Sequence, residues 1–381
     1  MVAAAFAGPS LFANAASNLP PLTPQELLTK VAEAEPSPLS GTVVYTARLG
    51  LPEVPLQGLR NVAPTDLLSG SSTIRVWTDG QERSRLALTN SLSEYSVVRD
   101  GAQAWTYSSS DNQAVHYTLS PADQAKYDAL TKSGVKPGPA IGDSLPSPSA
   151  AADAAIAQAG TDTTITVGSE TSIAGRDAYQ LGLVPKTDKT LIARVLIAVD
   201  AKTFTPLRVQ VWSTKDTASP AIELGFTDIS FAAPADSVFT FTPPAGATVK
   251  NQVVSLPDQS AAPDKSGMAD NVKTYGTGWE SVVQVNGFSL SDLTKTATRP
   301  DQTATAAPNL GSSGGLGGQF DKSGDMSGGL GINLSSLLSQ ATTTVPEGQL
   351  ISSSLLTILI TDDGRLLAGA VPAETLRTLA S

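Results

Sequence analysis

The sequence has no cysteine and only one histidine, His116. Without cysteine the chain can form no disulfide, no thiolate metal site and no thiol nucleophile, and it offers no cysteine for acylation. A Ser-His-Asp site would need His116 beside a nucleophile, and a histidine metal site usually needs several histidines. Because His116 lies inside a strand pattern, we interpret it as a sheet residue that faces solvent.

Charged residues are also scarce, at 16% of the chain, and the net charge is −10. The sequence contains no cluster of Lys and Arg, which argues against the basic face that nucleic-acid-binding proteins usually carry. P-loop, H-E-x-x-H and G-x-G-x-x-G patterns are absent as well. The adjacent Asp362 and Asp363 fit a turn better than a catalytic pair, whose members come from separate elements. We therefore predict no enzyme activity, no metal, no cofactor and no nucleic-acid partner.

Long apolar runs are missing too, because no stretch beyond the N-terminus approaches the roughly 18 uninterrupted apolar residues of a membrane span. Residues Met1–Ala16 are small and apolar, and Ala13-Asn14-Ala15 matches the A-x-A pattern of a signal-peptidase site. No Lys or Arg precedes Lys30, so the basic start of a signal peptide is missing. Segment 1–21 is therefore either signal-like or a disordered alanine-rich tail. We favour the first, which predicts export to the cell envelope or a periplasm-like space.

What the chain has in abundance is short alternating strand patterns closed by turn residues. A helix is predicted first, over Pro24–Ala32, with Thr23 as N-cap and Glu26 completing a capping box. Two further helical patterns occur at Ser120–Tyr127 and Ser149–Ala159. The predicted strands are Thr42–Leu49, Thr73–Thr78, Glu82–Leu88, Tyr95–Arg99, Gln103–Tyr107, Val115–Leu119, Thr163–Val167, Ala178–Val184, Leu191–Asp200, Leu207–Trp212 and Ile222–Phe226. Short hairpins with few helices indicate an α+β fold built on one large antiparallel sheet.

Regular patterns weaken after Lys250. Ala297–Gly331 is rich in glycine and serine, which predicts a flexible loop inside an extension that covers residues 251–349. The run Leu350–Thr361 lacks polar alternation, so we expect it to form a strand that is buried on both faces.

The chain ends with a turn signal at Asp362–Gly364, a strand pattern at Arg365–Val371 and a helix from Pro372. A strand that is buried on both faces needs sheet neighbours, and the turn favours a hairpin. We therefore predict that residues 350–381 return to the main sheet as a hairpin and helix, rather than forming a separate domain.

Four segments in the middle of the chain resemble the LolA/LolB-like superfamily, which includes periplasmic lipoprotein carriers and the RseB sensor of envelope stress. Gly175–Leu181 resembles the family's "G-r-x-a-y-x-L" strand, and Val195–Asp200 followed by Thr205-Pro206-Leu207 resembles its hairpin. Asp236–Ala247 resembles the closing "F-x-F-x-P-P-x-G", which we expect to be extended. The resemblance covers residues 22–250. The tail from Trp279 is similar to that of exported actinobacterial members.

The resemblance implies a half-open antiparallel β-barrel with lid helices over an apolar cavity that holds acyl chains. It implies a monomeric carrier for lipid or acylated lipoprotein, which meets a membrane protein as donor or acceptor. Two alternatives stay open. One is an RseB-like regulator that binds a membrane anti-sigma factor. The other is a structural envelope protein whose cavity is plugged by its own tail.

We predict the residues of the cavity wall from their common phase within each strand, because successive side chains point to opposite faces of a sheet. A shift of one residue would invert a strand. The predicted wall residues are Val43, Tyr45, Ile74, Val76, Leu86, Leu88, Trp105, Tyr107, Tyr117, Leu181, Leu183, Val209 and Val211.

Overall fold

The computed structural model describes residues 19–50, 70–89, 93–133, 146–256, 271–287 and 342–381. Most of the predicted signal-like segment and the whole predicted Gly-rich loop lie outside these ranges. Within them, no helix is both long and apolar enough to cross a membrane.

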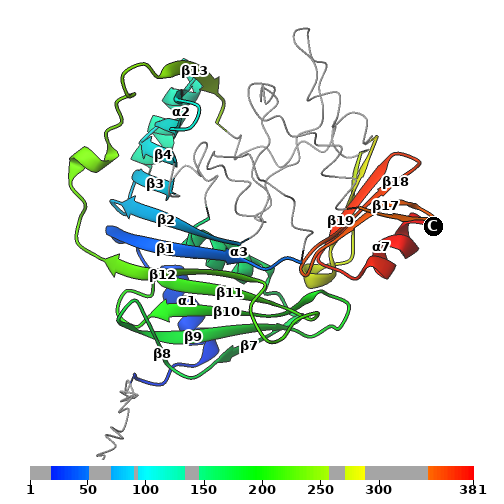
Figure 1. Cartoon of the computed structure of the whole chain (residues 1–381). Helices are drawn as coiled ribbons and strands as arrows, with labels where there is room; N and C mark the ends of the chain where they lie inside the picture. Colours follow the sequence, from blue (N-terminus) through cyan, green and yellow to red (C-terminus); the bar gives the residue numbers. More distant parts are fainter. Residues whose placement is uncertain (1–18, 51–69, 90–92, 134–145, 257–270, 288–341) are drawn as a thin grey trace, which may run out of the picture.

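In the described ranges, thirteen strands form the main sheet, which is curved and open (Figure 1). Its order is β13-β6-β5-β4-β3-β2-β1-β12-β11-β10-β9-β7, and β8 pairs with β9. Every pairing is antiparallel except that of β13 with β6. The bounds are β1 Leu39–Ala47, β2 Gly70–Thr78, β3 Arg83–Thr89, β4 Glu94–Asp100, β5 Gln103–Ser108, β6 Gln113–Leu119, β7 Thr163–Val167, β8 Thr171–Ile173, β9 Arg176–Pro185, β10 Ile192–Asp200, β11 Pro206–Ser213, β12 Ile222–Ser230 and β13 Thr248–Val254.

The predicted α+β class and the large antiparallel sheet are confirmed in this coarse form. Among the described strands the edges β13 and β7 do not pair, so the sheet does not close into a barrel. Hairpin turns fall at the predicted Asp79-Gly80 and Asp100-Gly101. Both glycines have positive φ, +78° at Gly80 and +60° at Gly101, which glycine adopts without strain.

Helix α1 spans Pro24–Glu33, one residue beyond its predicted end. The predicted capping box is present, because Thr23 Oγ1 accepts from the Glu26 N–H at 3.3 Å and the Glu26 carboxylate accepts from the Thr23 N–H at 2.8 Å. Helices α2 (Pro121–Lys132) and α3 (Pro148–Gln158) each begin with proline after a capping serine.

One segment expected to be extended is not a strand. Asp236–Phe239 forms the 3-10 helix η2, and the chain then runs without regular structure to β13. The prolines Pro243 and Pro244 carry no N–H for a sheet ladder, which accounts for the absence of pairing. The segment instead contacts β3 and β4 and carries the chain across to the far edge of the sheet (Figure 1).

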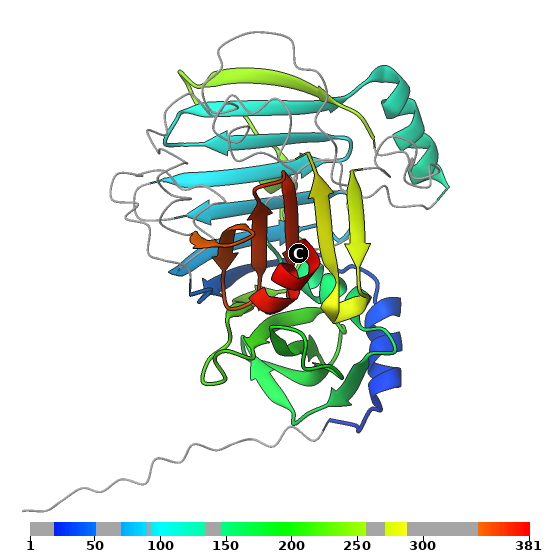
Figure 2. The same cartoon turned by 90° about the vertical axis from the view of Figure 1, so that its right-hand side faces the viewer.

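A second sheet of six strands holds the C-terminal part, in the order β14-β15-β19-β18-β17-β16 (Figure 2). The predicted hairpin is formed by β18 and β19, and its turn is at Asp362–Gly364. The prediction that it joins the main sheet is wrong, because its neighbours are β15 and β17. The bounds are β14 Val272–Tyr275, β15 Val282–Asn286, β16 Thr343–Val345, β17 Gly348–Ser352, β18 Thr357–Thr361 and β19 Arg365–Gly369, followed by helix α7 at Ala373–Ala380.

The run Leu350–Thr361 is also two strands rather than one, because serine breaks it. Ser353 Oγ accepts hydrogen bonds from the N–H groups of Leu355, at 3.2 Å, and Leu356, at 2.9 Å. Serine commonly turns a chain in this way, by offering the backbone an alternative to a ladder. In β18, Leu359 and Ile360 are both buried, so the expectation of burial on both faces holds for that strand.

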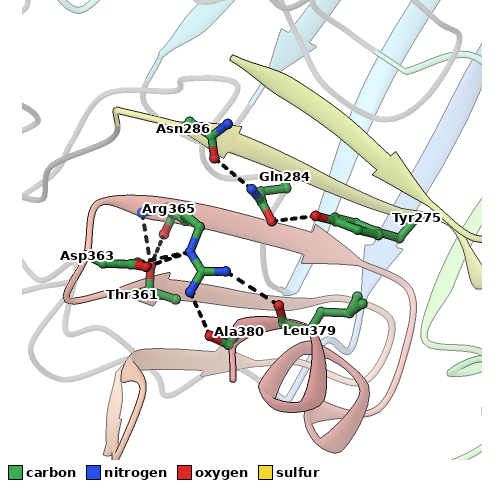
Figure 3. A network of polar contacts seen from close by, with 8 residues as sticks. All are labelled: Tyr275, Gln284, Asn286, Thr361, Asp363, Arg365, Leu379 and Ala380. Carbon is green, nitrogen blue, oxygen red and sulfur yellow. Dashed lines mark hydrogen bonds and ion pairs between the residues drawn. The ribbon is translucent and has the colours of Figure 1, made fainter. Parts of the chain in front are cut away.

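Arg365 fastens α7 onto the second sheet (Figure 3). Its guanidinium donates to the carbonyl of Ala380 at 2.6 Å, where a helix end lacks partners for its carbonyls, and to the Asp363 carboxylate at 2.8 Å. Hydrogen bonds from Arg365 and Thr361 lower the pKa of Asp363. The Asp362-Asp363 pair therefore sits in a turn, as its sequence indicates, and Asp363 is engaged in holding that turn.

Candidate ligand-binding face

The strand register places apolar side chains from most strands of the main sheet on one face. Val43 lies opposite Ile74 on one side and Phe226 on the other, and Ile74 lies opposite Leu88 of β3. The neighbouring row on the same face runs from Tyr45 through Leu224, Val209 and Ile197 to Leu181. Residues directly opposite each other in a ladder share a face. We call this side the concave face, because the sheet curves around it (Figure 1).

All of the predicted wall residues except two lie on the concave face. Following the register from Val43 leads through Ile74, Leu88, Tyr95 and Ser108 to Gln113 of β6. Tyr117 lies four residues further along β6, so it shares this face. Those on the concave face are Val43, Tyr45, Ile74, Val76, Leu86, Leu88, Tyr117, Leu181, Leu183, Val209 and Val211. The common phase of separate strands thus predicts a single surface.

Trp105 and Tyr107 are the exceptions, and their assignment to the wall is wrong. They alternate with Ala104 and so point to the opposite, convex face. There the Trp105 ring stacks on His116, with centroids 4.1 Å apart, and the ring of Phe241 lies 5.3 Å from it. Phe241 follows η2, so the crossing segment brings an aromatic cover to the convex face. His116 is half-buried beneath this contact rather than free in solvent.

Two helices pack against the β9–β11 end of the concave face. Leu27 of α1 and Ala152 of α3 are both fully buried, in a cluster with Leu181, Leu183 and Val209. Both belong to helices with small or apolar residues on the inward side, which allows close approach to the strands. That these helices act as lids over a cavity stays a prediction from the resemblance.

At the other end of the concave face, over β2 to β6, the apolar side chains differ in how deeply they are buried. Ile74 and Leu88 are almost completely buried, at 0% and 1% exposure, whereas Leu86 of the same ladder and Tyr117 of β6 are half-buried. The described part of the concave face thus carries both fully buried and half-buried apolar side chains. The half-buried ones are the positions where substitution can alter binding without emptying the core.

The part of the chain that forms the second sheet reaches the concave face through Leu355 and Trp279. Leu355, in the loop between β17 and β18, is buried in the same cluster as Val43 and Ile74. Its neighbour Ser354 ties the loop down, since its N–H donates to the carbonyl of Leu49 at 2.7 Å and its carbonyl accepts from Ser213 Oγ at 2.6 Å. The buried Trp279 makes a second attachment by donating to Thr163 Oγ1 at 2.7 Å.

An ion pair with a buried carboxylate, which sequence reasoning missed, holds the β10–β11 turn. The Asp200 carboxylate is 1% exposed and accepts from Arg176 and from the N–H groups of Lys202 and Thr203. Burial by itself would raise the pKa of Asp200, but these hydrogen bonds outweigh it and lower the pKa. The sequence feature that could have revealed it is an aspartate at the end of a strand, just before a turn. At such positions the carboxylate commonly accepts hydrogen bonds from the N–H groups of the next residues.

The described ranges contain no group of three or more His, Cys, Asp or Glu residues placed to hold a metal ion. His116 hydrogen-bonds to Gln103 at 3.0 Å and stacks on Trp105, which are structural contacts. The described part of the concave face offers apolar contacts over a large area of the sheet.

No protein-family model matches the chain, and no curated protein matches it. Among solved structures, MucB is similar at 18% identity and a TM-score of 0.39, over 93% of this chain and 95% of MucB. The complex of Pseudomonas aeruginosa MucA and MucB gives 17% identity and a TM-score of 0.40, over 94% and 96% of the chains. A LolA superfamily protein from Nitrosomonas europaea is similar at 16% identity and a TM-score of 0.23, over 58% of this chain and 99% of that protein.

One of these structures is described as a LolA superfamily protein, the superfamily that the sequence segments resemble. Because the TM-scores are 0.40 or below, the function has to rest on this chain's own residues and geometry.

Proposed function

We propose that the protein is an exported binding protein that holds acyl chains of a lipid or lipoprotein against its concave face. The supporting observation is that apolar side chains from Tyr117 of β6 through Val43 of β1 to Leu183 of β9 share one face of the main sheet. Removing an acyl chain from water contributes about 0.8 kcal/mol for each buried CH₂ group. An apolar face of this extent is therefore enough to hold a lipid chain without polar recognition.

A second candidate is a regulator that binds a protein partner and senses lipid, as the resemblance to RseB implies. The observation that favours it is the separate second sheet, which has its own core of Val282, Leu359, Leu367 and Leu376. RseB-like proteins also have a smaller second domain after the barrel. The MucB to which this chain is similar has been solved in complex with MucA. Both candidates use the concave face for lipid and differ in what the second sheet contacts.

The proposal includes no chemical step. The single histidine is packed between Trp105 and Gln103, and the predicted absence of enzyme activity is retained as part of the proposal. Replacing His116 by alanine is expected to leave ligand binding intact, since it lies on the convex face.

A matched pair of tyrosines tests which face binds. Tyr117 and Tyr107 are both half-buried on neighbouring strands, but they lie on opposite faces. We expect Tyr117→Ser to weaken binding of a dansyl-labelled fatty acid roughly tenfold, because one half-buried aromatic contact is lost, and Tyr107→Ser to leave it unchanged. Fluorescence titration gives the affinities and circular dichroism checks folding. Equal weakening by both variants, with both folded, would contradict the assignment of the concave face.

A further inference from the structure

The second sheet has an apolar face of its own. Successive residues of a strand alternate between faces, so the register of β15, β18 and β19 separates two sets. One set faces α7, since Val282, Leu359 and Leu367 pack with Leu376 of that helix. The opposite set, which we call the inner face, consists of Val283, Val285, Ile351, Ile358, Ile360 and Leu366.

The inner face is uncharged. The positions of β14 to β19 on this side include no charged residue, whereas the α7 side carries Arg365 and Lys273. Val285 and Ile360 are buried, at 7% exposure each, and the four others are half-buried. The four half-buried side chains leave apolar surface that an apolar ligand can contact.

The orientation of the second sheet shows which way its inner face points. In Figure 1, α7 lies on the side of the second sheet that is away from the main sheet, and Figure 2 shows α7 in front with the main sheet behind. Because α7 covers the other side, the inner face is turned toward the concave face of the main sheet. Leu355 joins the two, since it leaves the second sheet and enters the cluster of Val43 and Ile74.

We propose that the inner face is the second wall of the ligand site, so that an acyl chain lies between the two sheets. The proposal rests on the acyl-chain binding proposed above and adds a set of contact residues that the resemblance does not assign. A chain lying on one sheet alone would keep part of its surface in water, whereas a facing apolar sheet removes that part too. Two walls made mostly of apolar side chains favour an alkyl chain over a peptide, many of whose backbone groups would lack hydrogen-bond partners there.

Acyl-chain photolabelling of the full chain tests this arrangement. The probe is phosphatidylglycerol with a diazirine in one acyl chain, supplied as small vesicles, and labelled peptides are located by mass spectrometry. We expect labels on β2–β3 of the concave face and also on Val282–Asn286 or Thr357–Leu366, with none on α7 on the opposite side. Labels on the concave face alone would overturn the second wall and leave the proposed function standing. No labels on either face would overturn both.

Paired variants give an independent readout. Ile358 and Val345 are both half-buried in the second sheet, but Ile358 lies on the inner face and Val345 packs on the α7 side. We expect Ile358→Ser to weaken retention of phosphatidylglycerol about tenfold and Val345→Ser to have no effect on retention. Unchanged retention in folded Ile358→Ser, or equal loss in both variants, would show that a second copy, a protein partner or the chain itself covers this face.

Discussion

Removal of residues 350–381 is expected to turn the protein into an aggregating chain. The deletion takes away the rest of β17, with β18, β19 and α7, so β15 loses its neighbour β19. It also removes Leu355 from the core that contains Val43, and with it the hydrogen bonds of Ser354 to the end of β1. Exposed apolar sheet and unpaired strand edges both promote association. Light scattering during size-exclusion chromatography gives the oligomeric state.

The matched control for this deletion is removal of residues 311–331, which lie outside the described ranges and are rich in glycine and serine. Closing a loop of different length changes its entropy only slightly, so we expect that variant to stay monomeric. A soluble, monomeric chain that ends at residue 349 and still binds lipid would instead show that the second sheet is a dispensable module for a protein partner.

Replacing Asp200 by alanine should destabilise the main sheet by about 1.5–3 kcal/mol, the usual contribution of hydrogen bonds to a charged group. The Arg176 side chain that is left behind is 27% exposed, so water can solvate part of its charge. The variant would strand the Arg176 guanidinium and the N–H groups of Lys202 and Thr203. Denaturant unfolding followed by tryptophan fluorescence measures the change. The control is Glu374→Ala, which breaks the exposed pair with Arg377 and should cause no measurable change.

The same carboxylate makes stability depend on pH. Because the folded state lowers the pKa of Asp200, its contribution is present above the ordinary aspartate pKa of about 4 and is lost as the pH falls through the lower folded value. The difference in unfolding free energy between the natural chain and Asp200→Ala should therefore be constant near neutral pH and shrink in acid. A difference that grows as the pH falls would mean that Asp200 is not held as its ionised form.

The strands of the main sheet and most of the concave face could be predicted from the sequence. Alternation of apolar and polar residues is a local property, and strands such as Thr163–Val167 begin and end where it predicts. The shared phase of Val43, Ile74 and Leu88 also anticipated their burial on one side. Here the side-chain pattern and the register agree, because a buried face strongly specifies the register.

What could not be predicted depends on contacts between distant segments. Trp105 and Tyr107 have the size of core residues, and only the path of the segment with Phe241 shows that the convex face has a cover. Likewise, the apolar run at Leu350–Thr361 indicates that sheet neighbours exist but not which sheet supplies them. Its partners β16 and β19 become known only from the pairing itself.

Native mass spectrometry of the full-length protein purified from its host tests most directly whether the concave face carries lipid. The account predicts that the folded protein is heavier than its sequence by the mass of an acyl-chain compound, which is released on denaturation. It further predicts that Tyr117→Ser retains less of this compound and that Tyr107→Ser retains as much as the natural chain. A folded protein with only its own mass, both as purified and after incubation with phosphatidylglycerol vesicles, would contradict the account.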